Sequence, residues 1–139
     1  MYAASLRGVE IDLILRGICA LRPGIKGMSE NIKVRSNIGR FLEHSRVFYF
    51  ANGGGEAAEM YIGSADMMHR SFDRRVEVLT PILDPEIKLY LKDVILGSCL
   101  RDEVNARLLK HDGTYKRVAA RTGGGFDSQA HFIGLETPS

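Results

Sequence analysis

The stretch that decides the fold lies near the start of the chain and is Val9-Glu10-Ile11-Asp12-Leu13-Ile14-Leu15. It alternates apolar and polar residues and then becomes wholly apolar, a pattern typical of a strand that enters the interior of a sheet. The segment before it, Met1–Arg7, is typical of the last turns of a helix, and Gly8 is a common C-terminal helix stop. A helix, a glycine and a strand in this order predict an α/β fold. Because the chain begins inside this helix, we expect it to be one domain cut from a longer protein.

Further strands are predicted wherever alternating segments are bounded by turn residues. They cover residues 32–36, 44–50, 59–62, 75–79, 106–109 and 116–118. The run Asn52–Gly55 predicts a hairpin loop between two of them. A helix is predicted from Asp84, an N-cap residue before a proline, to Gly97, and a helical turn over residues 39–43. We therefore expect an α/β domain with one mixed sheet flanked by helices.

Composition and charge are those of an ordinary globular domain. The 139 residues are 45% apolar and 26% charged, and 19 Lys and Arg against 17 Asp and Glu leave a net charge of +2. This balance predicts no nucleic-acid partner, and the absence of a charge-free stretch of about 20 residues predicts no transmembrane segment. Two distant cysteines and a charged start without a secretory signal favour the cytoplasm. We expect one domain over residues 1–121 and a flexible, glycine-rich tail over residues 122–139.

His44 and Arg46 are the first candidates for chemistry. They stand two residues apart on a predicted strand, so their side chains are expected on the same face. A guanidinium offers a bidentate fork to phosphate oxygens, and a neutral imidazole can attack phosphorus or exchange a proton near pH 7. The pair is therefore a candidate phosphate site. The structural alternative is a histidine at the start of a strand that bonds a nearby carbonyl.

Weaker candidates for anion binding accompany this pair. The loop Gly63–Asp66 follows a strand, where backbone amides and the Ser64 hydroxyl can meet an anion. Several arginines lie beside strand ends or glycines, and a group of them on one sheet edge would suit a polyanion or a nucleotide. The residues selected as candidate phosphate or polyphosphate contacts are Arg22, Arg46, Ser64 and Arg75.

Metal binding by this chain alone is not predicted. The histidines and cysteines have no metal-ligand spacing. Four carboxylates remain as candidates for a Mg²⁺ ligand: Glu43, Asp66, Asp73 and Glu77. Of these, Asp73 stands next to Arg74 and is more typical of a surface ion pair. No metal-binding residue is therefore assigned.

Several blocks of the sequence, in order, resemble the bacterial polyphosphate kinase family. They are Leu15–Gly24, Ser29–Ile32, Gly39–Arg46, Asn52–Gly54, Gly63–Asp66 and Asp73–Val78. The resemblance runs from about residue 2 to about residue 118. It implies the most C-terminal domain of that multi-domain enzyme, and with it one half of a phospholipase D-like fold.

The resemblance implies a phosphotransferase. Members of this family reversibly transfer the terminal phosphate of ATP to a growing polyphosphate chain through a phosphohistidine, with Mg²⁺. The implied partners are ATP or ADP, inorganic polyphosphate and the preceding domains of the same enzyme. We expect a homo-oligomer when full length, in the cytoplasm or peripheral at the inner membrane. The phosphate-accepting histidine and most metal ligands belong to the preceding parts of the enzyme, so this domain alone is expected to be inactive.

The resemblance also assigns roles to single residues. The ATP-contacting arginine of the family's R-G-I-C block corresponds to Arg16, and the second active-site histidine of its F-L-E-H block corresponds to His44, which also contacts nucleotide. His44-Ser45-Arg46 stands where the phospholipase D superfamily has H-x-K, and Gly63–Asp66 where it has G-S-x-N. Because phosphoryl transfer depends on positioning and charge stabilisation, Arg16 is expected to neutralise phosphate charge and His44 to orient or protonate.

Two other classes of function stay open. One is a non-catalytic nucleotide- or polyanion-binding module that kept the fold. The other is a phosphodiesterase of the phospholipase D type, in which a homodimer pairs two copies of His44. That superfamily has an Asp seven residues after the histidine, where this chain has Ala51, and the difference disfavours diesterase chemistry.

Overall fold

The chain folds into two compact units. The computed structural model describes residues 1–68, 71, 73–119 and 123–135. Unit 1 comprises Met1–Leu42 and Ser98–Ser139, and unit 2 comprises Glu43–Gly97. Each unit has its own sheet, so the single sheet expected from the sequence is wrong for the described residues. The expected class, α/β with a mixed sheet, is confirmed in unit 1.

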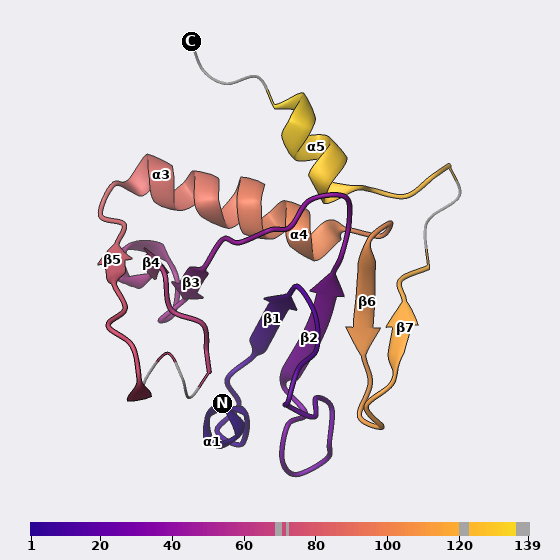
Figure 1. The fold of residues 1–139 in the computed structure, drawn as a ribbon. Coiled ribbons are helices and arrows are strands. Elements are labelled where there is room, and N and C mark those ends of the chain that lie inside the picture. The colour runs from indigo at the N-terminus through magenta and orange to yellow at the C-terminus, as the bar shows by residue number, and fades with distance from the viewer. Residues whose placement is uncertain (69–70, 72, 120–122, 136–139) are drawn as a thin grey trace. The chain divides into compact units, whose positions relative to one another are not determined.

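Unit 1 is built on a four-stranded mixed sheet (Figure 1). Its strands, in spatial order, are β1 (Ile11–Leu15), β2 (Ile32–Asn37), β6 (Ala106–Leu109) and β7 (Tyr115–Arg117). The β1 and β2 strands are parallel, whereas β2–β6 and β6–β7 are antiparallel. The opening stretch of the sequence is thus an edge strand of this sheet. It follows the short helix α1 (Tyr2–Ser5), and Gly8 adopts a left-handed φ of 84° after that helix, as a C-terminal stop requires.

The core of unit 1 lies on one face of this sheet. Ile32, Val34 and Leu109 are 1%, 2% and 9% exposed and form the buried cluster. Side chains packed against them are Tyr2, Ile11, Leu13, Leu15, Cys19 and Tyr115. Along β2 the burial alternates residue by residue, because successive side chains of a strand point to opposite faces. The apolar–polar alternation of the sequence is therefore confirmed in β2, where it separates buried from more exposed side chains.

Unit 2 contains a three-stranded antiparallel sheet. Its strands are β3 (Val47–Phe50), β4 (Glu59–Gly63) and β5 (Leu79–Pro81). The predicted hairpin joins β3 to β4, and its loop contains the short 3-10 helix η1 (Gly55–Ala57). Asn52, Gly53, Gly54 and Gly55 all have positive φ, which explains the glycine run at this turn. Met60 on β4 is 1% exposed and is the largest buried apolar side chain among the described residues of the unit.

The predicted helix start is confirmed, but the predicted helix end is wrong. Helix α3 (Pro85–Leu89) begins at its N-cap Asp84 and continues as the π-helical turns η2 (Tyr90–Leu96). Gly97 has helical φ and ψ of −60° and −41°, and α4 (Gly97–Arg101) follows without a break. Glycine permits a stop but does not impose one. The helical end is instead satisfied by Arg35, whose Nη1 donates to the carbonyl oxygens of Cys99 and Asp102 at 3.3 and 3.2 Å.

The N-cap provides a stability test of this assignment. The Asp84 Oδ1 accepts hydrogen bonds from the amides of Glu86 and Ile87 at 2.8 and 3.0 Å. Asp84→Ala leaves these amides without that partner and is expected to lower the free energy of unfolding by about 1 kcal/mol, measured by urea denaturation. Asp84→Asn keeps an accepting oxygen and serves as the control. Equal midpoints for the Ala and Asn variants would contradict the capping role.

The helical turn expected over residues 39–43 is not formed. The backbone there is held by a side chain that the local sequence does not contain. Gln129 accepts from the Phe41 amide through Oε1 at 2.9 Å and donates to the Phe41 carbonyl through Nε2 at 2.8 Å. A Cβ at Gly39 would collide with the same glutamine amide. A contact across 88 residues thus replaces the local helical hydrogen bonds.

The predicted strand over residues 75–79 is also misplaced, since β5 begins only at Leu79. Ser64 explains the late start. Its amide donates to the Val78 carbonyl at 3.1 Å, but the Val78 amide donates to the Ser64 hydroxyl at 3.2 Å instead of to a backbone carbonyl. A side chain therefore takes the place of one ladder bond. Val76, two residues earlier, is 99% exposed.

Part of the segment expected to be a flexible tail forms helix α5 (Ser128–Gly134). Its N-cap Asp127 accepts from the amides of Gln129 and Ala130 at 2.9 and 3.1 Å. Asp102, which has no exposed surface, accepts from both the amide and the hydroxyl of Ser128. Polar capping and a buried anchor, rather than apolar periodicity, thus order this segment. Residues 120–122 and 136–139 lie outside the described residues, so the boundary after residue 121 stays a prediction.

No helix among the described residues is both long and apolar enough to cross a membrane.

Candidate active site in unit 2

The β3–β4 hairpin brings two candidate motifs together. Its register pairs Val47 with Ile62, so the residues just before β3 lie beside the residues just after β4. The Gly63 amide donates to the Arg46 carbonyl at 3.1 Å, one step beyond the strand pairing. The segment that carries His44 and Arg46 therefore lies against the Gly63–Asp66 loop. From their own residues, these two motifs were separate candidates for phosphate or anion binding.

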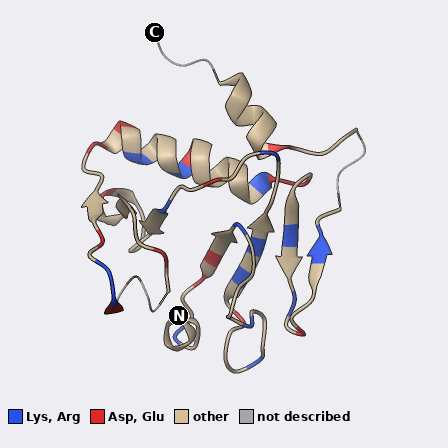
Figure 2. Cartoon of the chain, viewed as in Figure 1, with Lys and Arg blue, Asp and Glu red and all other residues tan. Residues whose placement is uncertain are grey.

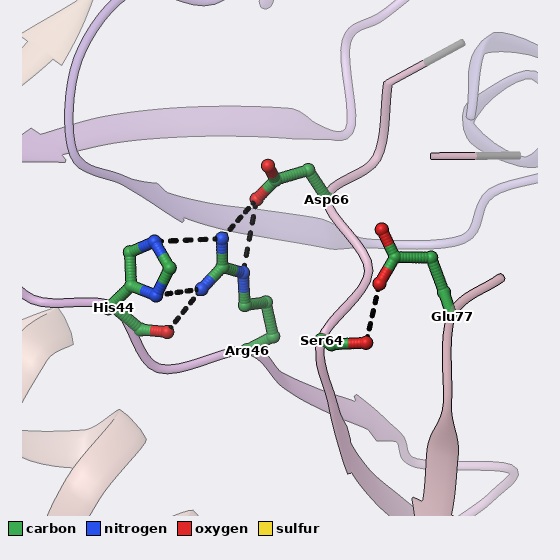
Figure 3. Close-up of polar contacts among 5 residues, drawn as sticks. All are labelled: His44, Arg46, Ser64, Asp66 and Glu77. Carbon is green, nitrogen blue, oxygen red and sulfur yellow. Dashed lines mark hydrogen bonds and ion pairs between the residues drawn. The ribbon is translucent and has the colours of Figure 1, made fainter. Parts of the chain in front are cut away.

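His44 and Arg46 contact each other, but not for the predicted reason. The predicted strand began at residue 44, whereas β3 begins at Val47, so both residues precede the strand and strand alternation does not align them. The contact arises because the Arg46 guanidinium turns back onto its own chain. Its Nη1 donates to the His44 carbonyl at 2.6 Å and lies 2.5 Å from Nδ1 of the imidazole (Figure 3).

The second partner of Arg46 is Asp66. The Nε and Nη2 of Arg46 donate to Asp66 Oδ1 at 3.1 and 2.9 Å, which makes a charge-assisted double contact on one oxygen (Figure 3). The side chains are 15% and 32% exposed, so this ion pair is more shielded from water than an ordinary surface pair. Arg46 is thereby fixed between the imidazole and the carboxylate.

The neutral form of His44 is the one that fits this arrangement. Arg46 has only donors, and a doubly protonated imidazolium has no acceptor to offer it. In the neutral ring one nitrogen is an acceptor, and the shorter of the two Arg46 contacts, 2.5 Å at Nδ1 against 3.2 Å at Nε2, favours Nδ1 for this role. The proton then lies on Nε2. A neutral imidazole with a defined Nε2 proton can donate to an oxygen of a phosphate or of a leaving group.

Ser64 lies on the same loop and is held by Glu77. Its hydroxyl donates to Glu77 Oε2 at 2.5 Å and accepts from the Val78 amide at 3.2 Å (Figure 3). Gly63 allows this pairing, because a Cβ there would collide with the Val78 carbonyl oxygen. Ser64 was predicted as a phosphate contact, and that role stays a prediction.

The other predicted contacts are exposed residues in both units. Arg75 lies in unit 2 on the segment before β5, and its side chain is exposed. Arg16 follows β1 and Arg22 lies in the loop before β2, both exposed and both in unit 1. Lys and Arg also occupy β2, β6 and β7 of the unit 1 sheet (Figure 2). Of the predicted set, Arg46 and Ser64 lie on the two segments that the β3–β4 pairing brings together in unit 2.

Carboxylates that could hold a metal are engaged by protein donors. Asp66 accepts from Arg46 and Glu77 accepts from Ser64. Within the described part of the chain, no three His, Cys, Asp or Glu side chains are grouped as a metal ion would require. The site in unit 2 is therefore built around a cation and an imidazole rather than around a carboxylate cluster.

The comparison with known proteins identifies the family. A family model described as polyphosphate kinase C-terminal domain 2 matches residues 1–129. The chain belongs to the polyphosphate kinase family. It is 58% identical over 115 residues to a polyphosphate kinase of Synechocystis sp., which covers 83% of this chain and 15% of that relative. It is 52% identical over 133 residues to a polyphosphate kinase of Lactiplantibacillus plantarum, covering 96% and 18%.

A solved polyphosphate kinase has the same fold over this region. The crystal structure of polyphosphate kinase from Porphyromonas gingivalis matches with a TM-score of 0.85 at 38% identity, covering 94% of this chain and 19% of that one. The resemblance noted from sequence blocks is thus confirmed. This chain spans less than a fifth of the length of these polyphosphate kinases.

Sequence reasoning missed Asp66 as the partner of Arg46. Asp66 was predicted as a candidate metal ligand and as part of the Gly63–Asp66 loop, but not as an ion-pair partner. The signal was the hairpin itself, because pairing residues 47–50 with 59–62 places Arg46 opposite Gly63 and so near Asp66. Asp66 then supplies what a partly buried arginine requires, a carboxylate within reach of its fork.

Proposed function

We propose that this chain is the C-terminal part of an ATP:polyphosphate phosphotransferase, which reversibly transfers the terminal phosphate of ATP to polyphosphate. The observation that carries the proposal is the family match over residues 1–129, which includes Arg16 and His44. The Arg46 contact at His44 Nδ1, which favours a neutral imidazole with its proton on Nε2, supports it further. This form suits proton exchange with phosphate and leaving-group oxygens near pH 7.

The reaction passes through a phosphohistidine in the preceding domain. In the first step the bond from the terminal phosphorus of ATP to its bridging oxygen breaks, ADP leaves, and a phosphorus–nitrogen bond forms. In the second step the terminal oxygen of polyphosphate attacks this phosphorus and the histidine is released. Arg16 stabilises the charge that develops on the phosphate, and His44 orients the reacting oxygens by donating a hydrogen bond to them from Nε2.

The described residues of this chain include no group of side chains suited to hold Mg²⁺. Asp66 and Glu77, the carboxylates of the site, are occupied by Arg46 and Ser64. We therefore propose that the ligands of the Mg²⁺ used by the complete enzyme lie outside this chain. ATP, ADP and inorganic polyphosphate are its proposed ligands, and the preceding domains are its proposed partners. We place the homo-oligomeric enzyme in the cytoplasm or peripherally at the inner membrane.

Binding to the chain by itself tests the nucleotide role of Arg16. Titration calorimetry with ATP and with polyphosphate is expected to show binding without turnover, since no residue here matches the phosphate-accepting histidine. Arg16→Ala is expected to weaken ATP binding roughly 10- to 100-fold, the range for a lost charge-assisted hydrogen bond. Arg7→Ala, which removes another exposed arginine of unit 1, is the matched control. Equal affinities of the two variants would contradict the assignment.

A further inference from the structure

All N–H groups of Arg46 are directed at two residues. A guanidinium has five donors in a planar fork. Nε and one donor of Nη2 are directed at Asp66 Oδ1, at 3.1 and 2.9 Å. Nη1 contacts the His44 carbonyl and Nδ1 at 2.6 and 2.5 Å, and Nη2 also lies 3.2 Å from Nε2. Four of the five donors of Arg46 thus meet acceptors on Asp66 and His44, and the fifth, on Nη2, faces the imidazole at Nε2.

We propose that Arg46 is a positioning residue for His44, and that Asp66 is the carboxylate that holds Arg46 in place. The importance of this relay for phosphoryl transfer rests on the proposed function, whereas its effect on the imidazole does not. Arg46 fixes the plane of the ring by its contacts with both nitrogens and the carbonyl of His44. It also favours one tautomer, because the closer contact, 2.5 Å at Nδ1 against 3.2 Å at Nε2, requires an acceptor at Nδ1.

Asp66 is needed because Arg46 alone does not hold this pose. A long arginine side chain loses considerable rotamer freedom when it is fixed. The Arg46 side chain is also only 15% exposed, so its charge is partly removed from water. The carboxylate compensates for both costs with two contacts from one oxygen. It comes from the loop after β4, which is tied to Arg46 by the Gly63 amide. The orientation of the imidazole thus depends on the β3–β4 pairing.

The variant Arg46→Lys distinguishes positioning of His44 from phosphate binding. An ammonium keeps the positive charge that a phosphate ligand needs. It has no planar fork, so it cannot contact Asp66 and the imidazole in the way the guanidinium does. Asp66→Ala removes the support and leaves Arg46 intact. Asp66→Asn retains an accepting oxygen and is the conservative variant. Glu56→Gln, an exposed acid of the same unit, controls for the loss of one negative charge.

The direct readout is the nitrogen-15 spectrum of the His44 imidazole in this chain. The wild-type chain and Glu56→Gln are expected to show one neutral tautomer, with Nδ1 unprotonated and Nε2 protonated. Arg46→Lys and Asp66→Ala are expected to show shifts averaged between the two tautomers, and Asp66→Asn an intermediate spectrum. Backbone amide signals of unit 2, which contains the site, verify that each variant is folded there. Unchanged His44 shifts in folded Arg46→Lys and Asp66→Ala would overturn the proposal.

Kinetics of the complete enzyme supply the second readout. A misplaced imidazole is expected to lower kcat roughly 10²-fold in Arg46→Lys and Asp66→Ala while the KM values for ATP and polyphosphate change little. A raised KM for polyphosphate with an unchanged kcat would make Arg46 a phosphate ligand and overturn the proposal. If no phosphoryl transfer is seen even in the wild type, the proposed function fails. The nitrogen-15 spectra then still decide whether Arg46 and Asp66 position His44.

Discussion

His44→Ala in the complete enzyme is expected to lower kcat for ATP-dependent polyphosphate synthesis by roughly 10²- to 10⁴-fold, the range for a positioned general acid or base. The physical reason is that alanine has no Nε2–H group to donate to the reacting oxygens. Arg46, 2.5 Å from Nδ1, orients the imidazole in the wild type. A water molecule that fills the space left by the ring would lack this orientation and would not present a donor in a fixed direction. The rate of ADP formation measured with saturating ATP and polyphosphate checks this expectation.

His111→Ala is the matched control for this variant. His111 is an exposed histidine in the turn between β6 and β7, so its loss removes the same side chain without touching the site. Thermal unfolding of both variants shows whether folding is preserved, which is expected because the imidazole of His44 is exposed. A kcat of the His44 variant within about twofold of the control would contradict a role in general acid–base chemistry.

Asp102→Ala is expected to be the most destabilising single change in unit 1. This fully buried carboxylate accepts from the amides of Asn105, Ala106 and Ser128, at 2.6, 3.2 and 2.9 Å, and from the Ser128 hydroxyl. Alanine leaves these donors buried without a partner, at a cost of about 3 kcal/mol or more. It also releases the start of α5. Urea denaturation followed by circular dichroism measures the loss, and Asp112→Ala, at an exposed turn, is the control.

The same carboxylate gives stability a defined dependence on pH. Burial alone would raise the pKa of Asp102, but hydrogen bonds donated by Ser128 and Asn105 outweigh it and hold the pKa below the usual aspartate range. The unfolded chain therefore binds this proton at higher pH than the folded chain. The contribution of Asp102 is present above about pH 4 and is lost as the pH falls through the lowered folded value. Asp102→Asn is expected to abolish this part of the acid destabilisation.

The sequence predicts those features that depend on neighbouring residues. Alternation along β2 and the glycine run at residues 53–55 were sufficient for a strand and a hairpin, because the pleat and the positive φ values are local properties. Asp84 was recognised for the same reason, since an N-cap bonds amides two and three residues away.

Features that depend on distant partners could not be predicted in this way. The clamp at Arg46 needs Asp66, 20 residues on, and the conformation at Phe41 needs Gln129, 88 residues on. Ser64 changes where β5 begins through a side-chain hydrogen bond, which no periodicity records. The candidate histidine was therefore found from the sequence, whereas the arrangement that fixes its ring required the folded structure.

Phosphoryl transfer is tested most directly by following the terminal phosphate of ATP. The complete enzyme is incubated with ATP labelled with phosphorus-32 at the terminal position, together with polyphosphate, and the label in acid-insoluble polyphosphate is counted. We predict that label enters polyphosphate in the wild type and in His111→Ala, and that transfer falls roughly 10²-fold or more in His44→Ala. Absence of label from polyphosphate in the wild type, as a binding module or a phosphodiesterase would give, would contradict this prediction.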